Sequence, residues 1–298
     1  MDILDPKEVV MNDVSFDTAI YDAEEGKEVT IHIPDAGPTP QDLLRAKFVA
    51  MMQIQDELNC SKNVNWRLSQ HNYEDAMMIE TAEMFDQMNW KWWKANPNPV
   101  DWNQVKLELI DVWHFALCRV MVQQGIDDGS LELVEIFIDH DFFVADHYDD
   151  DVNAGLIQEG DAPLIEQAVV LTSVRDLMQG IMQDNVEEAE GHTALRNLSY
   201  LYDVAGVMLA LGMTVDELYQ LYIGKVELNR LRWANGYGTT YIKTWFGKED
   251  NIRLIELMNG LDTNAPDFRM KVRASLEESY KGVKADAFAK SIQEHPGE

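Results

Sequence analysis

The sequence has 298 residues, of which 53 are acidic and 24 are basic, so its formal net charge is −29. Such a polyanion is repelled by phosphate backbones, which argues against nucleic acid as a partner. The sequence has no apolar run long enough to cross a membrane, and its acidic N-terminus lacks the pattern of a secretory signal. The cysteines, Cys60 and Cys118, form no paired motif, which indicates a reduced, cytoplasmic setting.

The first 38 residues differ from the rest of the chain. Apolar and polar side chains alternate from Val29 to Ile33, ahead of a turn-forming Pro-Asp-Ala-Gly-Pro, and predict a short strand or extended arm. Helical signals begin at Thr39, a residue type that caps helices, with Pro40 at the first helical position. We therefore separate an N-terminal extension, 1–38, from a main domain, 39–298.

The main domain shows helical periodicity over most of its length. Helices are predicted at about 39–59, 73–93, 101–124, 163–187 and 192–212. Another helix is predicted to begin at Thr214, and after a loop at Gly236 and Gly238 one or two further helices follow. The proline-rich residues 95–100 end the second helix and Gly125 ends the third. Segment 126–162 is very acidic and is interpreted as a variable insertion. The pattern predicts an all-α helical bundle with a small N-terminal β appendage.

Two pairs of carboxylates lie on consecutive predicted helices, and the two members of each pair are three positions apart. Glu80 and Glu83 form the first pair, and Glu108 and Asp111 form the second. At 3.6 residues per turn the members of a pair share a face, and apolar residues such as Val112 lie on the same side. Two interpretations remain open: an ordinary solvated helix face, or a site shared between the two helices.

The short connection between these helices favours an antiparallel pair, which would bring the four acids together. Four anions in a partly dry groove repel one another and lose hydration, so they either take up protons or bind a hard cation. A set of carboxylates without histidine or cysteine suits Mg²⁺, or Mn²⁺, rather than Zn²⁺. The sequence therefore predicts a divalent cation site between the two helices.

Several motifs resemble those of one known family. They read "QIQDELN", "ETAEMFDQMNWKWWK", "ELIDVWHF" and "YIGKVELNRLRWANGYGTTYIKTWFGKEDN". Together they resemble the dimeric all-α dUTPases, a branch of the all-α nucleoside triphosphate pyrophosphohydrolase superfamily. The resemblance covers about residues 43–125 and 214–251. The paired acidic motifs are shared across the superfamily, whereas the tryptophan-rich stretch and the last motif are more specific to the dUTPase branch.

The resemblance implies hydrolysis of dUTP to dUMP and pyrophosphate. In that family pattern, Glu80, Glu83, Glu108 and Asp111 hold Mg²⁺ ions that bridge the phosphates, and either Glu80 or Glu83 is catalytic, orienting or deprotonating the attacking water. Positioning and charge neutralisation are what triphosphate hydrolysis needs, so this expectation agrees with the reading of the acids alone.

The resemblance also implies a set of substrate-binding residues and a homodimer. The residues near the base are Gln55, Asn59, Trp90 and Trp93; Phe115 packs against the sugar; and Lys225, Asn229, Arg232, Tyr237 and Lys243 contact phosphates and sugar. An amide side chain both donates and accepts, which suits the edge of uracil. His114 is interpreted as a structural residue rather than a catalytic one.

Two alternatives to dUTP hydrolysis stay open. The same chemistry on dCTP or a modified pyrimidine deoxynucleotide needs only a change in a few polar contacts to the base. A catalytically idle acidic protein that binds a partner is the alternative from another class. The cations Lys225, Arg232 and Lys243, in a chain with few cations, argue against the idle protein, because a triphosphate needs several of them.

Overall fold

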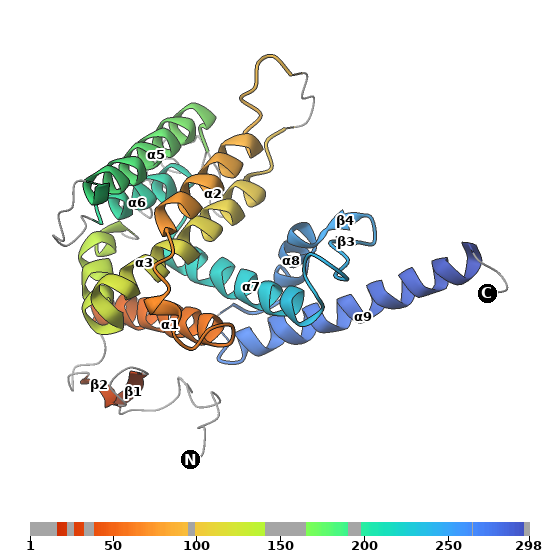
Figure 1. Ribbon diagram of the computed structural model, residues 1–298, viewed down its shortest axis with the longest axis horizontal. Coiled ribbons are helices and arrows are strands. Elements are labelled where there is room, and N and C mark those ends of the chain that lie inside the picture. The colour runs from red at the N-terminus through yellow and green to blue at the C-terminus, as the bar shows by residue number, and fades with distance from the viewer. Residues whose placement is uncertain are drawn as a thin grey trace, which may run out of the picture.

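The computed structural model describes residues 17–22, 27–32, 39–94, 99–140, 165–189, 198–263 and 265–294. Helices dominate these residues, as expected for an all-α bundle (Figure 1). The helices are α1 (Pro40–Cys60), α2 (Tyr73–Gln87), α3 (Trp102–Phe137), α5 (Gln167–Ala189), α6 (Tyr200–Ala210), α7 (Val215–Ala234), α8 (Asp250–Met258) and α9 (Phe268–Glu294), with a short 3₁₀ helix at Trp66–Leu68.

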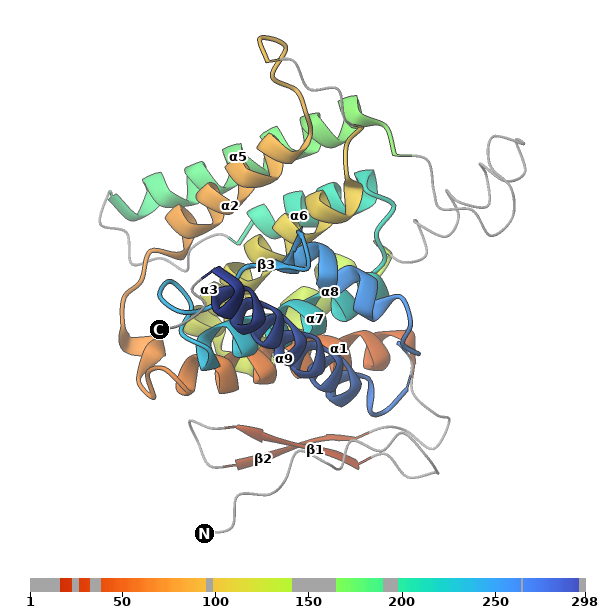
Figure 2. The same ribbon diagram turned by 90° about the vertical axis from the view of Figure 1, so that its right-hand side faces the viewer.

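The N-terminal extension contains a small antiparallel hairpin. Strand β1 (Asp17–Asp22) pairs with β2 (Lys27–His32), and Asp17 lies opposite His32. The hairpin lies apart from the helical body in both views (Figures 1 and 2). The predicted strand at 29–33 is therefore confirmed up to His32, whereas Ile33 falls outside the described residues.

Helix α1 begins where the sequence predicts. The Thr39 hydroxyl accepts from the Asp42 amide, and the Asp42 carboxylate accepts from the Thr39 amide at 2.9 Å, which satisfies donors that a helix leaves open at its start. Thr214 caps α7 in the same way by accepting from the Glu217 amide at 3.1 Å. Helices α1 and α7 thus start at the capping residues that their local sequences predict.

Helix α2 is shorter than predicted. It was expected to reach Trp93, but it ends at Gln87, because Asn89 has a φ of 55° and lies in the left-handed region, where a right-handed helix cannot continue. The proline-rich stretch is therefore not what ends the helix. Trp90 and Trp93 consequently sit in irregular backbone beyond the helix, and their positions do not follow helical spacing.

Helix α3 continues beyond its predicted end. Gly125 interrupts the helix with φ 75° and ψ −170°, as a glycine stop should, but the chain resumes helical geometry and runs to Phe137. The first part of the predicted acidic insertion, 126–137, therefore belongs to α3. Residues 141–164 of that region lie outside the described residues.

The helix predicted at 163–187 is observed as α5, a few residues later in the chain. The helix predicted at 192–212 is observed as α6, which begins only at Tyr200, and residues 192–197 lie outside the described residues. The C-terminal region forms α8 and α9. Two very short strands, β3 (Thr244–Trp245) and β4 (Lys248–Glu249), pair before α8. Among the described residues, none of the helices combines the length and apolarity needed to cross a membrane.

The helices form two groups around α3. Helix α2 runs antiparallel to α3, with α5 and α6 beside this pair, whereas α1, α7, α8 and α9 lie toward the other end of the molecule (Figures 1 and 2). Helix α3 contacts both groups, and its buried Trp113 and Phe137 rings pack against Phe48 of α1 with centroid distances of 6.1 and 5.5 Å. Helix α3 therefore packs against α2 on one side and against α1 and α7 on the other, around a shared aromatic and aliphatic core.

Candidate metal centre

Three glutamates from α2 and α3 come together. Carboxylate oxygens of Glu80, Glu83 and Glu108 lie within 4.8 Å of one another. Glu108 is buried, Glu80 is half-buried and Glu83 is exposed, so the group opens to solvent on the Glu83 side. Antiparallel packing of the two helices is what joins the two acidic motifs, as the short connection predicted.

The electrostatics of this acidic centre favour protonation or cation binding. Burial, the Asp111 carboxylate and the Glu83 carboxylate together raise the pKa of Glu80 to about 7. Burial also raises the pKa of Glu108, although Lys225 opposes the shift. The amide of Gln87 donates to Glu108 at 3.3 Å. Carboxylates that are mutually repelled and partly desolvated in this way are relieved when they share a divalent cation.

The donor atoms fit Mg²⁺ or Mn²⁺. They are all carboxylate oxygens, the ligand type that hard divalent cations prefer, and one side of the group is open for water and phosphate oxygens. Glu80, Glu83 and Glu108 are the residues that would hold the cation, with Asp111 as the neighbouring acid.

Asp111 has a cationic partner from α7. Its Oδ2 atom lies 2.7 Å from the Nζ atom of Lys225, whose side chain is almost fully buried. Lys225 also donates to the Asn251 side chain at 3.2 Å. The ion pair fixes the ammonium group beside the acidic centre.

A buried polar network extends from Lys225 to the end of α7. Arg232 donates to Asn251 at 3.1 Å and to both carboxylate oxygens of Asp250 at 2.8 Å, and it donates to Asn229 at 3.2 Å. Tyr241 donates to Asp250 at 2.8 Å. Lys225 and Arg232 are therefore connected through Asn251 of α8, and Asn229 bonds directly to Arg232.

Two members of this network were missed by the sequence reading. Asp250 and Asn251 are buried, and each links a cation of α7 to α8. The available signal was their position at the start of an amphipathic helix in the quoted motif, "GKEDN", where polar side chains precede an apolar run. That signal alone gives no partner, because the contacts join residues that are far apart in the chain.

The predicted base-contacting amides lie side by side on α1. The Nε2 atom of buried Gln55 donates to the Oδ1 atom of Asn59 at 3.0 Å, and the Asn59 amide donates to the Cys118 sulfur at 3.1 Å. His114 Nδ1 lies 2.7 Å from Gln55 Oε1, and Tyr222 donates to that oxygen at 3.1 Å. Gln55 is thus fixed internally, whereas Asn59 is half-buried nearer the surface.

His114 is a neutral, buried side chain. Burial lowers its pKa to about 4, so the imidazole carries no charge at neutral pH. Because the Gln55 oxygen only accepts, Nδ1 carries the proton, and Nε2 has no hydrogen-bond partner among the described residues. The structural interpretation of His114 agrees with this burial.

The predicted aromatic residues occupy three different settings. Trp90 packs edge-on against Phe85 and Trp93, with centroid distances of 4.9 and 5.3 Å, just beyond the end of α2. Trp93 is about half exposed. Phe115 is half-buried on α3, one residue after His114, and packs against the core.

The two remaining predicted positions lie at the surface. The Tyr237 ring is 5.4 Å from the Arg232 guanidinium and is half exposed. Lys243 is exposed, and its ammonium lies 3.5 Å from Glu249 of β4. Tyr237 therefore contacts the buried network through Arg232. Lys243 instead pairs with Glu249 of β4 at the surface.

This fold and this centre define a helical protein in which three glutamate carboxylates from two helices converge beside the buried cations Lys225 and Arg232. A family model described as dUTPase matches residues 47–237, which is more than half of the chain. The chain therefore belongs to this dUTPase family. A search of curated proteins finds no match.

Proposed function

We propose that the protein hydrolyses dUTP to dUMP and pyrophosphate in a reaction that depends on Mg²⁺. The observation that carries the proposal is the meeting of Glu80, Glu83 and Glu108, with the Asp111–Lys225 pair beside them. The family match covers all of these residues. Acidic oxygens for the cation and ammonium groups for the phosphates are the two requirements of phosphoryl chemistry.

The acids have distinct tasks in this proposal. Glu80, Glu83 and Glu108 hold Mg²⁺, which when bound neutralises phosphate charge and lowers the pKa of the attacking water. Either Glu80 or Glu83 orients that water and accepts its proton. Buried Glu108 is fixed by the Gln87 amide and gives the centre a rigid wall.

The cations stabilise charge that develops on the phosphates. Lys225 and Arg232 are both buried, and their partners hold them in place, so they are already oriented when the substrate arrives. Asn229 is fixed by Arg232, and Tyr237 covers the guanidinium. We assign these four residues to the triphosphate and the sugar, and the exposed Lys243 to a phosphate contact at the rim.

Base recognition is assigned to the amides of α1 and to the aromatic residues. Asn59 presents its amide from a half-buried position, supported by Gln55 and by the Cys118 sulfur. Trp90 and Trp93 would wall the base, and Phe115 would pack against the sugar, where an apolar ring disfavours a 2′-hydroxyl. The same residues are also compatible with dCTP as the substrate, because the cytosine edge differs from the uracil edge only in its hydrogen-bond donors and acceptors.

One experiment tests the proposal and its rivals. Pyrophosphate release is measured from dUTP, dCTP, dTTP and UTP with and without Mg²⁺, using the wild type, Glu83→Gln and a matched control, Glu135→Gln, an exposed glutamate of α3. We expect preference for dUTP, dependence on Mg²⁺, and a loss of roughly a hundredfold or more in Glu83→Gln alone. Preference for dCTP would overturn the base assignment, and absence of any turnover would favour the idle binding protein.

We also propose that the protein acts as a homodimer, as the family resemblance implies. In support, neighbouring helices α2 and α5 expose the apolar side chains Ile79, Val169 and Met182. Sedimentation at micromolar concentration should give twice the mass of one chain. A species with the mass of a single chain at that concentration would contradict the proposal.

A further inference from the structure

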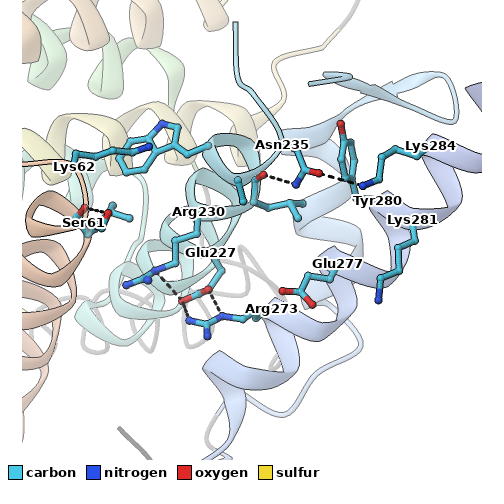
Figure 3. Close-up of a pocket in the computed structure, with 14 residues that line it drawn as sticks. Ser61, Lys62, Glu227, Arg230, Asn235, Arg273, Glu277, Tyr280, Lys281 and Lys284 are labelled. Atoms are coloured by element: carbon cyan, nitrogen blue, oxygen red, sulfur yellow. Dashed lines mark hydrogen bonds and ion pairs between the residues drawn. The ribbon is translucent and has the colours of Figure 1, made fainter. Parts of the chain in front are cut away.

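A cavity of about 520 Å³ lies between the end of α1, the C-terminal half of α7 and α9. Figure 3 shows side chains from the three helices converging on it. Its size falls within the range of small-molecule sites. Lys225 and Arg232 point from one face of α7 toward Asp111 of α3 and the start of α8. The lining residues Glu227, Arg230 and Ala234 lie on the face of α7 that is turned toward α9. The cavity is therefore separate from the acidic centre.

The guanidinium groups around this cavity are balanced by carboxylates. Buried Glu227 accepts from Arg269 and Arg273 at 2.7 Å, and Arg230 lies 3.7 Å from it. Burial alone would raise the pKa of Glu227, but these guanidiniums hold it below its usual value. Arg230 and Arg269 also pair with Glu57 at 3.0 and 3.2 Å. With Glu277 beside Arg273, three arginines face three acids.

Three lysines remain in excess after this balance. Lys62 lies over the Trp233 ring at 4.5 Å, and Lys284 donates to the Asn235 side chain at 3.2 Å and lies over the Tyr280 ring. Lys281 projects from the next turn of α9 (Figure 3). Among the described residues, none of the three is paired with a carboxylate, although the chain has 53 acidic residues.

The excess of positive charge indicates the kind of ligand. Three like charges around one cavity repel one another, and an anion with several charged oxygens relieves that repulsion. At physiological salt the Debye length is about 8 Å, so acidic residues farther than this from the cavity are largely screened. The lysines at the cavity therefore dominate its interaction with an anion. Leu58, Leu231 and Trp233 give the cavity an apolar wall as well.

We propose that this cavity binds a small oligophosphate-bearing molecule, with its phosphates on Lys62, Lys281 and Lys284 and its remaining part against Leu231 and Trp233. The chemistry is that of free pyrophosphate or of a nucleoside diphosphate. The site does not rest on the proposed function, because it uses none of the acidic centre and needs no Mg²⁺.

Calorimetric titration of the full chain with pyrophosphate and with dUDP, in EDTA and at physiological salt, tests this site. EDTA removes divalent cations, so the carboxylates of the acidic centre repel both probes. The test variant replaces Lys62, Lys281 and Lys284 by alanine. The control variant replaces the exposed Lys94, Lys271 and Lys290 by alanine, which changes the net charge equally.

We expect binding of both probes to wild type and control, and weakening by roughly tenfold or more in the test variant. Tighter binding of dUDP than of pyrophosphate would identify a nucleotide ligand, and equal binding would identify a free oligophosphate. Equal affinity in the test and control variants, or no binding to the wild type, would overturn the site. The test variant should keep its melting temperature and its Mg²⁺-dependent turnover, so a failed substrate assay and a failed cavity assay are distinguishable.

Discussion

The Lys225 ammonium lies 2.7 Å from the Asp111 carboxylate and places a buried positive charge next to three converging glutamates. The ammonium neutralises one acid, and in the proposed function it also contacts a phosphate of the substrate. Its presence lowers the local negative charge that a divalent cation would otherwise experience. If the protein acts as proposed, Lys225 should therefore weaken Mg²⁺ binding and strengthen phosphate binding at this centre.

Replacing Lys225 by methionine should separate these two effects. Without the ammonium, Mg²⁺ should bind roughly tenfold more tightly at alkaline pH, because one repelling charge near the centre is gone. Turnover of dUTP should fall by roughly tenfold or more, because a phosphate contact is lost. Calorimetric titration with Mg²⁺ and steady-state kinetics measure the two quantities.

The matched control for this variant is Lys106→Met, which removes another largely buried lysine, paired with Glu217 at 2.7 Å away from the acidic centre. It should change neither quantity by more than about twofold. If Lys225→Met left both Mg²⁺ affinity and turnover unchanged, Lys225 would have no part in the site.

The acidic centre should make the effect of Mg²⁺ on stability depend on pH. Burial and the neighbouring carboxylates raise the pKa of Glu80 from 4.5 to about 7 on folding. A raised pKa means that its contribution to stability is fully present below about pH 4.5 and is lost as pH rises through about 7. Mg²⁺ replaces the lost proton, so it should raise the melting temperature by several degrees at about pH 8 and by little at about pH 6.

Glu80→Gln is the diagnostic variant for this pH effect. A neutral amide does not titrate, so the melting temperature without Mg²⁺ should vary less between about pH 6 and about pH 8 than in the wild type. Its Mg²⁺-induced shift should also shrink, because one ligand is lost. An equal Mg²⁺-induced shift at both pH values in the wild type would show that Glu80 is not protonated in the metal-free protein.

The sequence predicted those features that depend on local chemistry. Thr39 and Thr214 cap helices because their hydroxyls reach backbone amides three residues ahead, and the spacing within each acidic motif requires only helical geometry. The predicted end of α2 was wrong because the left-handed backbone conformation of Asn89, which ends the helix, is not evident from the sequence. The resumption of α3 after Gly125 depends on packing of the following residues, such as Phe137 against Phe48.

The contacts that sequence reasoning could not supply are those between distant segments. Arg232 and Asp250 are paired through a turn whose shape no local pattern gives, and Lys225 reaches Asn251 in the same way. The family resemblance named the α7 cations without naming their acidic partners. The cavity of Lys62, Lys281 and Lys284 combines residues from just after α1 and from α9, and such a convergence requires the three-dimensional fold.

The Arg232–Asp250 pair should be a main support of the C-terminal half of the fold. Both side chains are buried, and Asp250→Ala would leave the guanidinium and the Tyr241 hydroxyl without their shared acceptor. We expect the free energy of unfolding to fall by about 3–5 kcal/mol, measured by urea denaturation. Asp286→Ala removes the exposed partner of Lys290 on α9 and should cost at most about 1 kcal/mol. Equal losses in the two variants would contradict a structural role for Asp250.

Asn59 offers a test of base recognition that perturbs the fold little. Its side chain is half-buried, and among the described residues it hydrogen-bonds to Gln55 and the Cys118 sulfur, so Asn59→Ala should remain folded. If the amide contacts the uracil edge, KM for dUTP should rise by roughly tenfold while kcat changes less, because a hydrogen bond to the bound base is lost. Asn63→Ala, an exposed amide just after α1, is the matched control and should leave KM unchanged. An Asn59→Ala enzyme with unchanged KM and unchanged preference between dUTP and dCTP would remove Asn59 from the base pocket and leave recognition to the tryptophans.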